Sequence, residues 1–146
     1  RVGIRFNPAL HGMMGIEVDD ETTELYNYVM TRLNDYPLAY IHLTEPFTDV
    51  SKVDLAIKEV AKHFRKFYKG TIITNVRYTK ETANQVISSG DADLVAFGTL
   101  YIANPDLVER FKVDAPLNTP DKDTYYTPGE KGYTDYPKMA ESSESI

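Results

Sequence analysis

The stretch DLVAFGTLYIANPDLVERF, residues 93–111, decides how the chain folds. Its apolar run at residues 94–97 is typical of a buried strand, and Gly98 ends that run. A helical pattern begins only at Asn104-Pro105-Asp106, with Asn104 as the expected N-cap, and continues to residue 111. The glycine either simply ends the strand or lets another group approach the backbone, and the spacing alone leaves both interpretations open.

Three further apolar runs have the same character, and helical patterns separate them. The runs are short, rich in Val, Ile, Tyr and Phe, and show little strict alternation, which is typical of strands buried on both faces. They lie at residues 2–6, 38–43 and 70–74. The helical patterns lie at residues 20–34, 52–68 and 80–89, the last with Thr79 as N-cap and Gly90 after its end.

This alternation predicts an α/β fold of parallel βα units with right-handed crossovers. The units form either a small doubly wound sheet or the C-terminal half, strands five to eight, of a TIM-type (β/α)8 barrel. No GxGxxG fingerprint or P-loop follows the first strand, which disfavours a nucleotide-binding open sheet. The chain also opens at Arg1 almost inside a strand, so we expect a segment upstream and favour the half barrel.

We expect two regions along the chain. Residues 1–112 form the four βα units, and residues 113–146 form a tail that packs on the barrel. The tail is rich in tyrosine and proline and has little periodicity. We expect it to be ordered to about Pro137 and frayed over its last residues, AESSESI.

Composition excludes several classes of function. The 146 residues are 42% hydrophobic and 26% charged, which is typical of a globular domain, and the net charge of −6 argues against nucleic acid as a partner. No apolar run has the length of a membrane span, so we expect no membrane partner. The absence of cysteine excludes disulfides and a thiol nucleophile, and it fits a cytoplasmic location.

In a barrel, function lies at the C-terminal ends of the strands, and a phosphate site often forms from the loops after strands seven and eight. Those loops would be residues 75–79 and 98–104. Arg5 is the sharpest signal, because a guanidinium near the end of an apolar strand needs a partner. That partner is either a structural carboxylate or an anionic ligand.

The other polar residues carry weaker signals. We interpret His42 as a core histidine, with Glu45 either orienting it or pairing elsewhere. The three histidines have no metal-ligand spacing, so no metal site is predicted, and no serine lies on a G-x-S-x-G elbow. Asp91 and Asp93 precede the last strand at its N-terminal end, which in a barrel serves stability rather than function, so we expect a solvated turn there.

Several segments together resemble the C-terminal half of the old yellow enzyme family. They are RVGIRFNP, LAYIHLTEP, ADLVAFGTLYIANPDLVERF, APLN and DKDTYYTP followed by GYTDYP. The resemblance implies a (β/α)8 barrel with FMN at its C-terminal mouth, in which NADPH reduces the flavin and the flavin reduces an activated alkene. It also implies that the catalytic residues lie in the first half of the barrel, so that none lies in this chain and the N-terminal half is its partner.

The resemblance assigns roles to individual residues. Arg5 matches the arginine beside the flavin pyrimidine ring, Gly98 matches the glycine at the FMN phosphate, and Tyr126 matches a tyrosine that lines the substrate side. Two positions depart from the family pattern. Thr99 replaces the phosphate arginine, and Val76-Arg77 replaces a glycine-containing pair, although Val76 can still offer its N–H and Arg77 can supply the lost charge.

The departures leave alternatives open. The intact protein is either an FMN-dependent ene-reductase acting on α,β-unsaturated carbonyl compounds or a flavin-free barrel scaffold or interaction protein with a degenerate phosphate site. A third reading is a different barrel enzyme that binds another phosphorylated ligand through Arg77. We expect the isolated half barrel to be inactive and to self-associate through its exposed strand edges.

Overall fold

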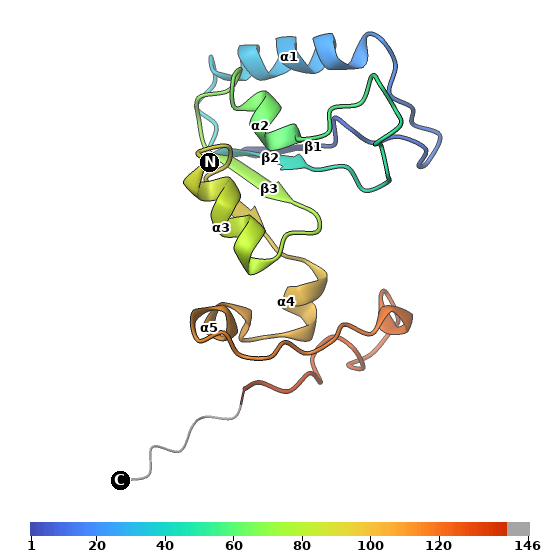
Figure 1. Ribbon diagram of the computed structural model, residues 1–146, viewed down its shortest axis with the longest axis vertical. Coiled ribbons are helices and arrows are strands. Elements are labelled where there is room, and N and C mark those ends of the chain that lie inside the picture. Colours follow the sequence, from blue (N-terminus) through green and yellow to red (C-terminus); the bar gives the residue numbers. More distant parts are fainter. Residues whose placement is uncertain (140–146) are drawn as a thin grey trace. The chain divides into compact units, whose positions relative to one another are not determined.

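The computed structural model describes residues 1–139, and by internal contacts the chain divides into two units, Arg1–Ala96 and Phe97–Ile146. The first unit contains four strands and three helices in strict alternation (Figure 1). These are β1 (Gly3–Phe6), α1 (Thr22–Leu33), β2 (Tyr40–Thr44), α2 (Val60–Phe64), β3 (Ile72–Asn75), α3 (Lys80–Ser88) and β4 (Leu94–Ala96). The described part of the second unit contains α4 (Thr99–Ala103), α5 (Leu107–Lys112) and the 3₁₀ turn η1 (Lys122–Thr124).

The four strands form one parallel sheet in the order β1-β2-β3-β4. Sequential order with helical crossovers is the arrangement of a barrel wall, whereas a doubly wound sheet reverses its strand order at a switch point. The register places Arg5 opposite His42, and Thr44 opposite Asn75. The carboxyl ends of β1, β2 and β3 therefore meet at one edge, as the sequence predicted.

One face of the sheet packs against the helices, and the other face is open. Ile41, Leu43 and Ile72 are fully buried in a core with Met30 of α1 and Phe64 of α2. Because side chains alternate along a strand, residues one position away from these lie on the opposite face. In register on that open face are Arg5, His42 and Ile73.

α3 confirms the predicted helix at residues 80–89 within one residue. Thr79 and Thr82 form a capping box, in which each side chain accepts a hydrogen bond from the other's backbone N–H. Gly90 follows the helix with φ +78°, the left-handed conformation that suits glycine after a C-terminus. The helix predicted at residues 20–34 is also found, as α1.

The helix predicted over residues 52–68 is wrong in length, because α2 is only Val60–Phe64. Glu59 has the non-helical angles φ −123° and ψ 85°, so the chain enters the helix at that point. The residues before it pack into a separate small apolar cluster that contains Val50, Val53 and Ala56. Their apolar spacing therefore serves a packed loop rather than the first turns of a helix.

The predicted delay after Gly98 is also wrong, because α4 begins directly at Thr99. Asn104 is not the N-cap of α5. It is fully buried, its amide donates to the Leu100 carbonyl at 2.9 Å, and its Oδ1 accepts from the backbone N–H of Asn118 at 2.7 Å. Asp106 precedes the first helical residue instead.

The tail begins with residues that hydrogen-bond to α4 and α5 within the second unit. The expected fraying of AESSESI concerns residues 140–146, which lie outside the described residues. Within residues 1–139, no helix is long and apolar enough to cross a bilayer.

Candidate flavin-binding site

Arg5 lies at the carboxyl end of β1, and its guanidinium reaches the ends of the two neighbouring strands. Its Nε and Nη2 donate to Thr44 Oγ1 at 3.3 and 3.2 Å. With the Asn75 amide turned so that both of its ends are satisfied, the Asn75 oxygen accepts from Arg5 Nη2 at 3.2 Å and its nitrogen donates to Thr44 Oγ1 at 3.3 Å. Three parallel strands thus fix one cation.

The partners of Arg5 are neutral. No carboxylate among residues 1–139 forms an ion pair with its guanidinium. The structural ion pair that the sequence left open is therefore not present, and the positive charge of Arg5 is uncompensated within the described chain. A fixed cation with neutral supports is suited to a ligand that is anionic or that gains negative charge.

His42 lies beside Arg5 on the open face of the sheet. Burial lowers the pKa of His42, and the positive charge of Arg5 lowers it further. The ring is half-buried, and its Nε2 is buried without a hydrogen-bond partner among the described residues. Both effects disfavour a second positive charge on His42 beside Arg5.

Glu45 pairs elsewhere and does not orient His42. Its carboxylate accepts from the backbone N–H groups of Val60 at 2.7 Å and Ala61 at 2.9 Å, so it caps the start of α2. Thr74 Oγ1 also donates to it at 3.2 Å. Burial raises the pKa of Glu45, which these hydrogen bonds oppose. This carboxylate is committed to the fold, since it joins β2, β3 and α2.

The loop after β3 has a backbone that normally requires glycine. Val76 and Arg77 have φ values of +84° and +58°, and for a β-branched residue such as valine this conformation is strained. The loop thus has a left-handed course at both positions, Val76 and Arg77.

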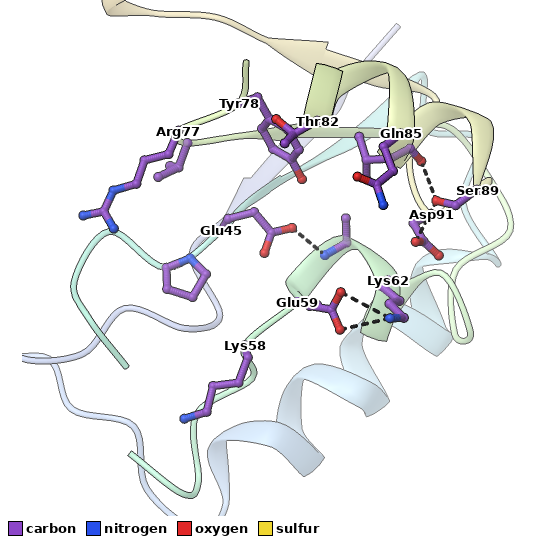
Figure 2. A pocket seen from close by; sticks show the side chains of 14 residues that line it. Glu45, Lys58, Glu59, Lys62, Arg77, Tyr78, Thr82, Gln85, Ser89 and Asp91 are labelled. Carbon is purple, nitrogen blue, oxygen red and sulfur yellow. Dashed lines mark hydrogen bonds and ion pairs between the residues drawn. The ribbon is translucent and has the colours of Figure 1, made fainter. Parts of the chain in front are cut away.

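The guanidinium of Arg77 is held by a backbone carbonyl of the loop after β2. Its Nη2 donates to the Phe47 carbonyl at 2.7 Å, so the guanidinium lies against the loop after β2 (Figure 2). Beside it lies a groove of about 640 Å³ between α2 and α3, into which Glu45, Tyr78 and Gln85 project (Figure 2). Burial also raises the pKa of Tyr78. The groove is on the helix side of the sheet and does not include Arg5.

In the second unit, Gly98 directly precedes α4 and Thr99 is the first residue of that helix. A Cβ built on Gly98 would meet no atom within 4 Å, so the glycine is not required by packing inside the chain. Tyr126 is 96% exposed and has φ +61°, an uncommon conformation for an aromatic residue. Gly98 is thus open to the approach of another group, and the Tyr126 side chain is available for contact.

Sequence reasoning missed Thr44 and Asn75, the two side chains that hold Arg5. Thr44 is the last residue of β2, and Asn75 is the last residue of β3. Each is a polar residue at the end of a largely apolar strand. That position was the available signal, because carboxyl ends of parallel strands meet at one edge. Asp91 and Asp93 lie at the other end, where Asp93 pairs with Arg65 and accepts from the backbone N–H of Ile72.

Known proteins with similar sequences and structures include reductases and an old yellow enzyme. The chain is 42% identical to a putative 12-oxophytodienoate reductase 5 of Oryza sativa subsp. japonica over 99% of its own length and 39% of that protein. It matches the old yellow enzyme from Trypanosoma cruzi with a TM-score of 0.83 and 41% identity, covering 94% of this chain and 35% of that one. It matches morphinone reductase in complex with tetrahydroNAD with a TM-score of 0.83 and 37% identity, covering 100% and 38%.

The chain therefore spans about two fifths of the length of the relatives that it matches. Its fold is part of the (β/α)8 barrel of old yellow enzymes, as the strand order predicted. A family model matches residues 1–118, which is most of the chain. The chain belongs to the NADH:flavin oxidoreductase / NADH oxidase family.

Proposed function

We propose that the protein containing this chain is an FMN-dependent ene-reductase that uses NADPH to reduce the C=C bond of α,β-unsaturated carbonyl compounds. The observation that carries the proposal is Arg5, a cation held by Thr44 and Asn75 with no carboxylate partner in the described chain. The relatives named as oxophytodienoate and morphinone reductases support this class of reaction. The complex of morphinone reductase with tetrahydroNAD supports a nicotinamide reductant.

The residues of this chain fit the proposed cofactor. When bound, FMN would supply the hydride transfer from the nicotinamide to the alkene. Arg5 would hold the pyrimidine edge of the ring, where negative charge gathers on reduction, and Thr44 and Asn75 would keep the guanidinium in place. Burial and Arg5 lower the pKa of His42, which disfavours a second positive charge on that residue.

We assign the phosphate of FMN to two segments. One is the left-handed turn at Val76 and Arg77, whose N–H groups would face the phosphate. The other is Gly98 with Thr99 at the start of α4, where the phosphate would approach the open backbone. Successive N–H groups in such turns bind anions without a side-chain charge. Tyr126 is assigned to the substrate side. The proton donor and the residues that hold the substrate carbonyl belong to the part of the barrel outside this chain.

That other part of the barrel is the partner that the open face of the sheet requires, and the small-molecule enone is the proposed substrate. A cytoplasmic location completes the proposal, supported by a sequence without cysteine. Association of copies through the sheet edges at β1 and β4 is expected only where the rest of the barrel does not cover them.

The test uses the full-length protein that contains this chain. We expect the purified protein to be yellow and to consume NADPH when cyclohexenone is added, with loss of the enone measured by gas chromatography. The matched control is the same reaction without the alkene. Failure to reduce any activated alkene, in a preparation that holds FMN, would contradict the proposed reaction.

One observation favours the alternative of a flavin-free scaffold. Arg77 donates a hydrogen bond to the Phe47 carbonyl, and Thr99 stands where the resemblance expects the phosphate arginine, so neither residue offers a free guanidinium for the phosphate. A charge-assisted contact is worth about 1.5–3 kcal/mol, which corresponds to roughly ten- to a hundredfold in affinity. A colourless full-length preparation that does not quench FMN fluorescence would support the scaffold.

A further inference from the structure

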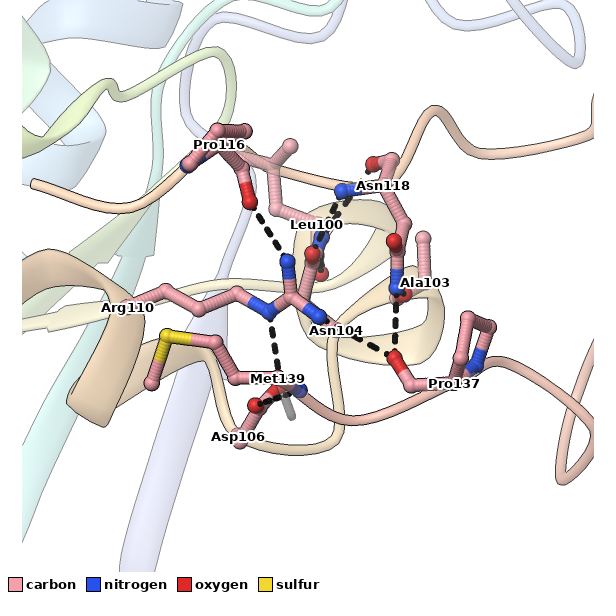
Figure 3. Close-up of polar contacts among 9 residues, drawn as sticks. All are labelled: Leu100, Ala103, Asn104, Asp106, Arg110, Pro116, Asn118, Pro137 and Met139. Carbon is pink, nitrogen blue, oxygen red and sulfur yellow. Dashed lines mark hydrogen bonds and ion pairs between the residues drawn. The ribbon is translucent and has the colours of Figure 1, made fainter. Parts of the chain in front are cut away.

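Arg110 of α5 is a buried cation that pairs with Asp106 and donates two hydrogen bonds to the C-terminal tail. The residue is 6% exposed, and its Nε donates to Asp106 Oδ1 at 2.8 Å (Figure 3). Its Nη1 donates to the Pro116 carbonyl and its Nη2 to the Pro137 carbonyl at 3.1 Å. One guanidinium therefore joins two points of the tail that are far apart in sequence.

Asn118 also joins the two ends of this tail segment. Its Nδ2 donates to the Pro137 carbonyl at 2.8 Å and to the Ala103 carbonyl at 2.8 Å, while its N–H donates to buried Asn104 (Figure 3). Asp106, already paired with Arg110, also accepts from the backbone N–H of Met139 at 2.6 Å. Residues 119–136, which we term the tail loop, therefore have both ends fixed to α4 and α5.

The tail loop is also packed internally. The Asp121 N–H donates to the Tyr136 hydroxyl at 2.8 Å, and Thr124 is buried. Gly132, with φ +75°, lies so close to Thr124 that an added Cβ would be 1.9 Å from Thr124 Oγ1. Its joined ends and internal contacts make the tail loop a compact unit.

Tyr126 is the one fully exposed aromatic side chain of the tail loop. Tyr126 is 96% exposed and keeps a left-handed backbone, while its N–H donates to the Tyr133 hydroxyl of the same loop. Backbone strain at an exposed aromatic residue persists only where the surrounding structure enforces it. The loop therefore fixes the backbone from which the Tyr126 side chain projects, and the contacts of Arg110 and Asn118 fix the ends of the loop.

We infer that Arg110 and Asn118 are positioning residues that close the base of the tail loop and so hold Tyr126 toward the enone substrate. The inference rests on the proposed function for its substrate side only. The closure of the loop by Arg110 and Asn118 is independent of any ligand. The two parts are therefore separable by experiment.

The experiment uses the full-length protein with FMN and compares Arg110→Met, Arg110→Lys and Asn118→Ala with Glu109→Gln. Glu109 forms an exposed ion pair with Lys112 on the same helix and makes a matched control. Trypsin has sites inside the tail loop at Lys122 and Lys131. Because cleavage tracks the population of the open loop, loss of the charge-assisted bonds should speed cutting at these sites by about tenfold or more.

We expect Arg110→Met and Asn118→Ala to speed this cleavage and to raise the KM for cyclohexenone more than they lower kcat, with FMN content unchanged. Arg110→Lys should lie between them and the wild type, and Glu109→Gln should match the wild type. If Arg110→Met fails to fold, Asn118→Ala gives the decision. Unchanged cleavage in folded variants would overturn the closure, and faster cleavage with unchanged KM would overturn the positioning of Tyr126.

A wild-type protein that reduces no alkene would remove the proposed function and the substrate side of the inference. The cleavage rates would still decide the closure by Arg110 and Asn118. Failure of the proposed function and failure of the closure therefore give different results.

Discussion

Arg5 and His42 lie in register on neighbouring strands, and their electrostatic interaction can be measured at a single residue. Burial is the larger cause of the lowered His42 pKa, and Arg5 is the second. Arg5→Met should therefore raise the His42 pKa, but not fully to its ordinary value of 6.5. Imidazole chemical shifts followed by NMR across pH check this, and an unchanged or lower pKa would contradict the electrostatic interaction between the two residues.

The direction of the pH effect on stability follows from the same shift. A histidine whose pKa is depressed in the folded state binds fewer protons than it does in the unfolded chain. The stability that His42 contributes is thus fully present above pH 6.5 and is lost as the pH falls through its folded pKa. His63 acts in the same direction, because burial and then Lys66 lower its pKa.

Val76 provides the second prediction at the residue scale. Valine at φ +84° is strained by roughly 1–3 kcal/mol, and glycine adopts this conformation freely. Val76→Gly should therefore raise the free energy of unfolding by about 1 kcal/mol in urea denaturation, after the entropic cost of glycine is subtracted. The control is Val108→Gly in α5, where glycine should destabilise by about 1 kcal/mol. Destabilisation at both positions would show that the loop carries no strain at Val76.

At the scale of the element, α3 depends on its capping box. Thr79 Oγ1 accepts from the backbone N–H of Thr82, and the N–H of Thr79 donates to Thr82 Oγ1. Thr79→Ala leaves one of these donors unsatisfied and should lower the free energy of unfolding by about 1 kcal/mol. Ser88→Ala in the exposed last turn should change it by less than about 0.5 kcal/mol. Equal effects of the two substitutions would argue against the cap.

The sequence predicted those elements whose signals are local. α3 has its N-cap, its apolar stripe and its terminal glycine within one continuous segment, so its bounds were predicted within one residue. α2 was predicted far too long because the carboxylate of Glu45, which follows β2 and is distant in the sequence, determines where the helix starts. A periodic pattern carries no information about such a contact. The cluster around Val50 and Ala56 has the same apolar spacing without being helical.

The candidate site was predicted in part for the same reason. Arg5 stood out because it is charged within an apolar strand. Its partners Thr44 and Asn75 come from two other strands, and only the register of the sheet brings them together. Asn104 has the sequence of an N-cap, but its amide is required inside the fold by Asn118. The role of Arg110 was not predicted, since its partners Pro116 and Pro137 lie in the aperiodic tail.

At the scale of the molecule, the parallel sheet has edges at β1 and β4, and among residues 1–139 the helix-packed core lies on one face of it. Leu94 and Tyr40 are 52% and 38% exposed in this sheet. Unpaired edges and exposed apolar surface favour association. The isolated 146-residue chain should therefore form oligomers in size-exclusion chromatography with light scattering. A stable monomer that unfolds in a single cooperative transition would contradict this expectation.

The central claim is that Arg5 binds the flavin, and a titration of FMN into the full-length apoprotein tests it most directly. The wild type should quench FMN fluorescence at one equivalent, and Arg5→Met should bind FMN about ten- to a hundredfold more weakly. The control is Arg32→Met, which removes an exposed arginine of α1 that pairs with Asp35 and should leave the affinity unchanged. Equal affinity of the wild type and Arg5→Met, or no binding by either, would contradict the account.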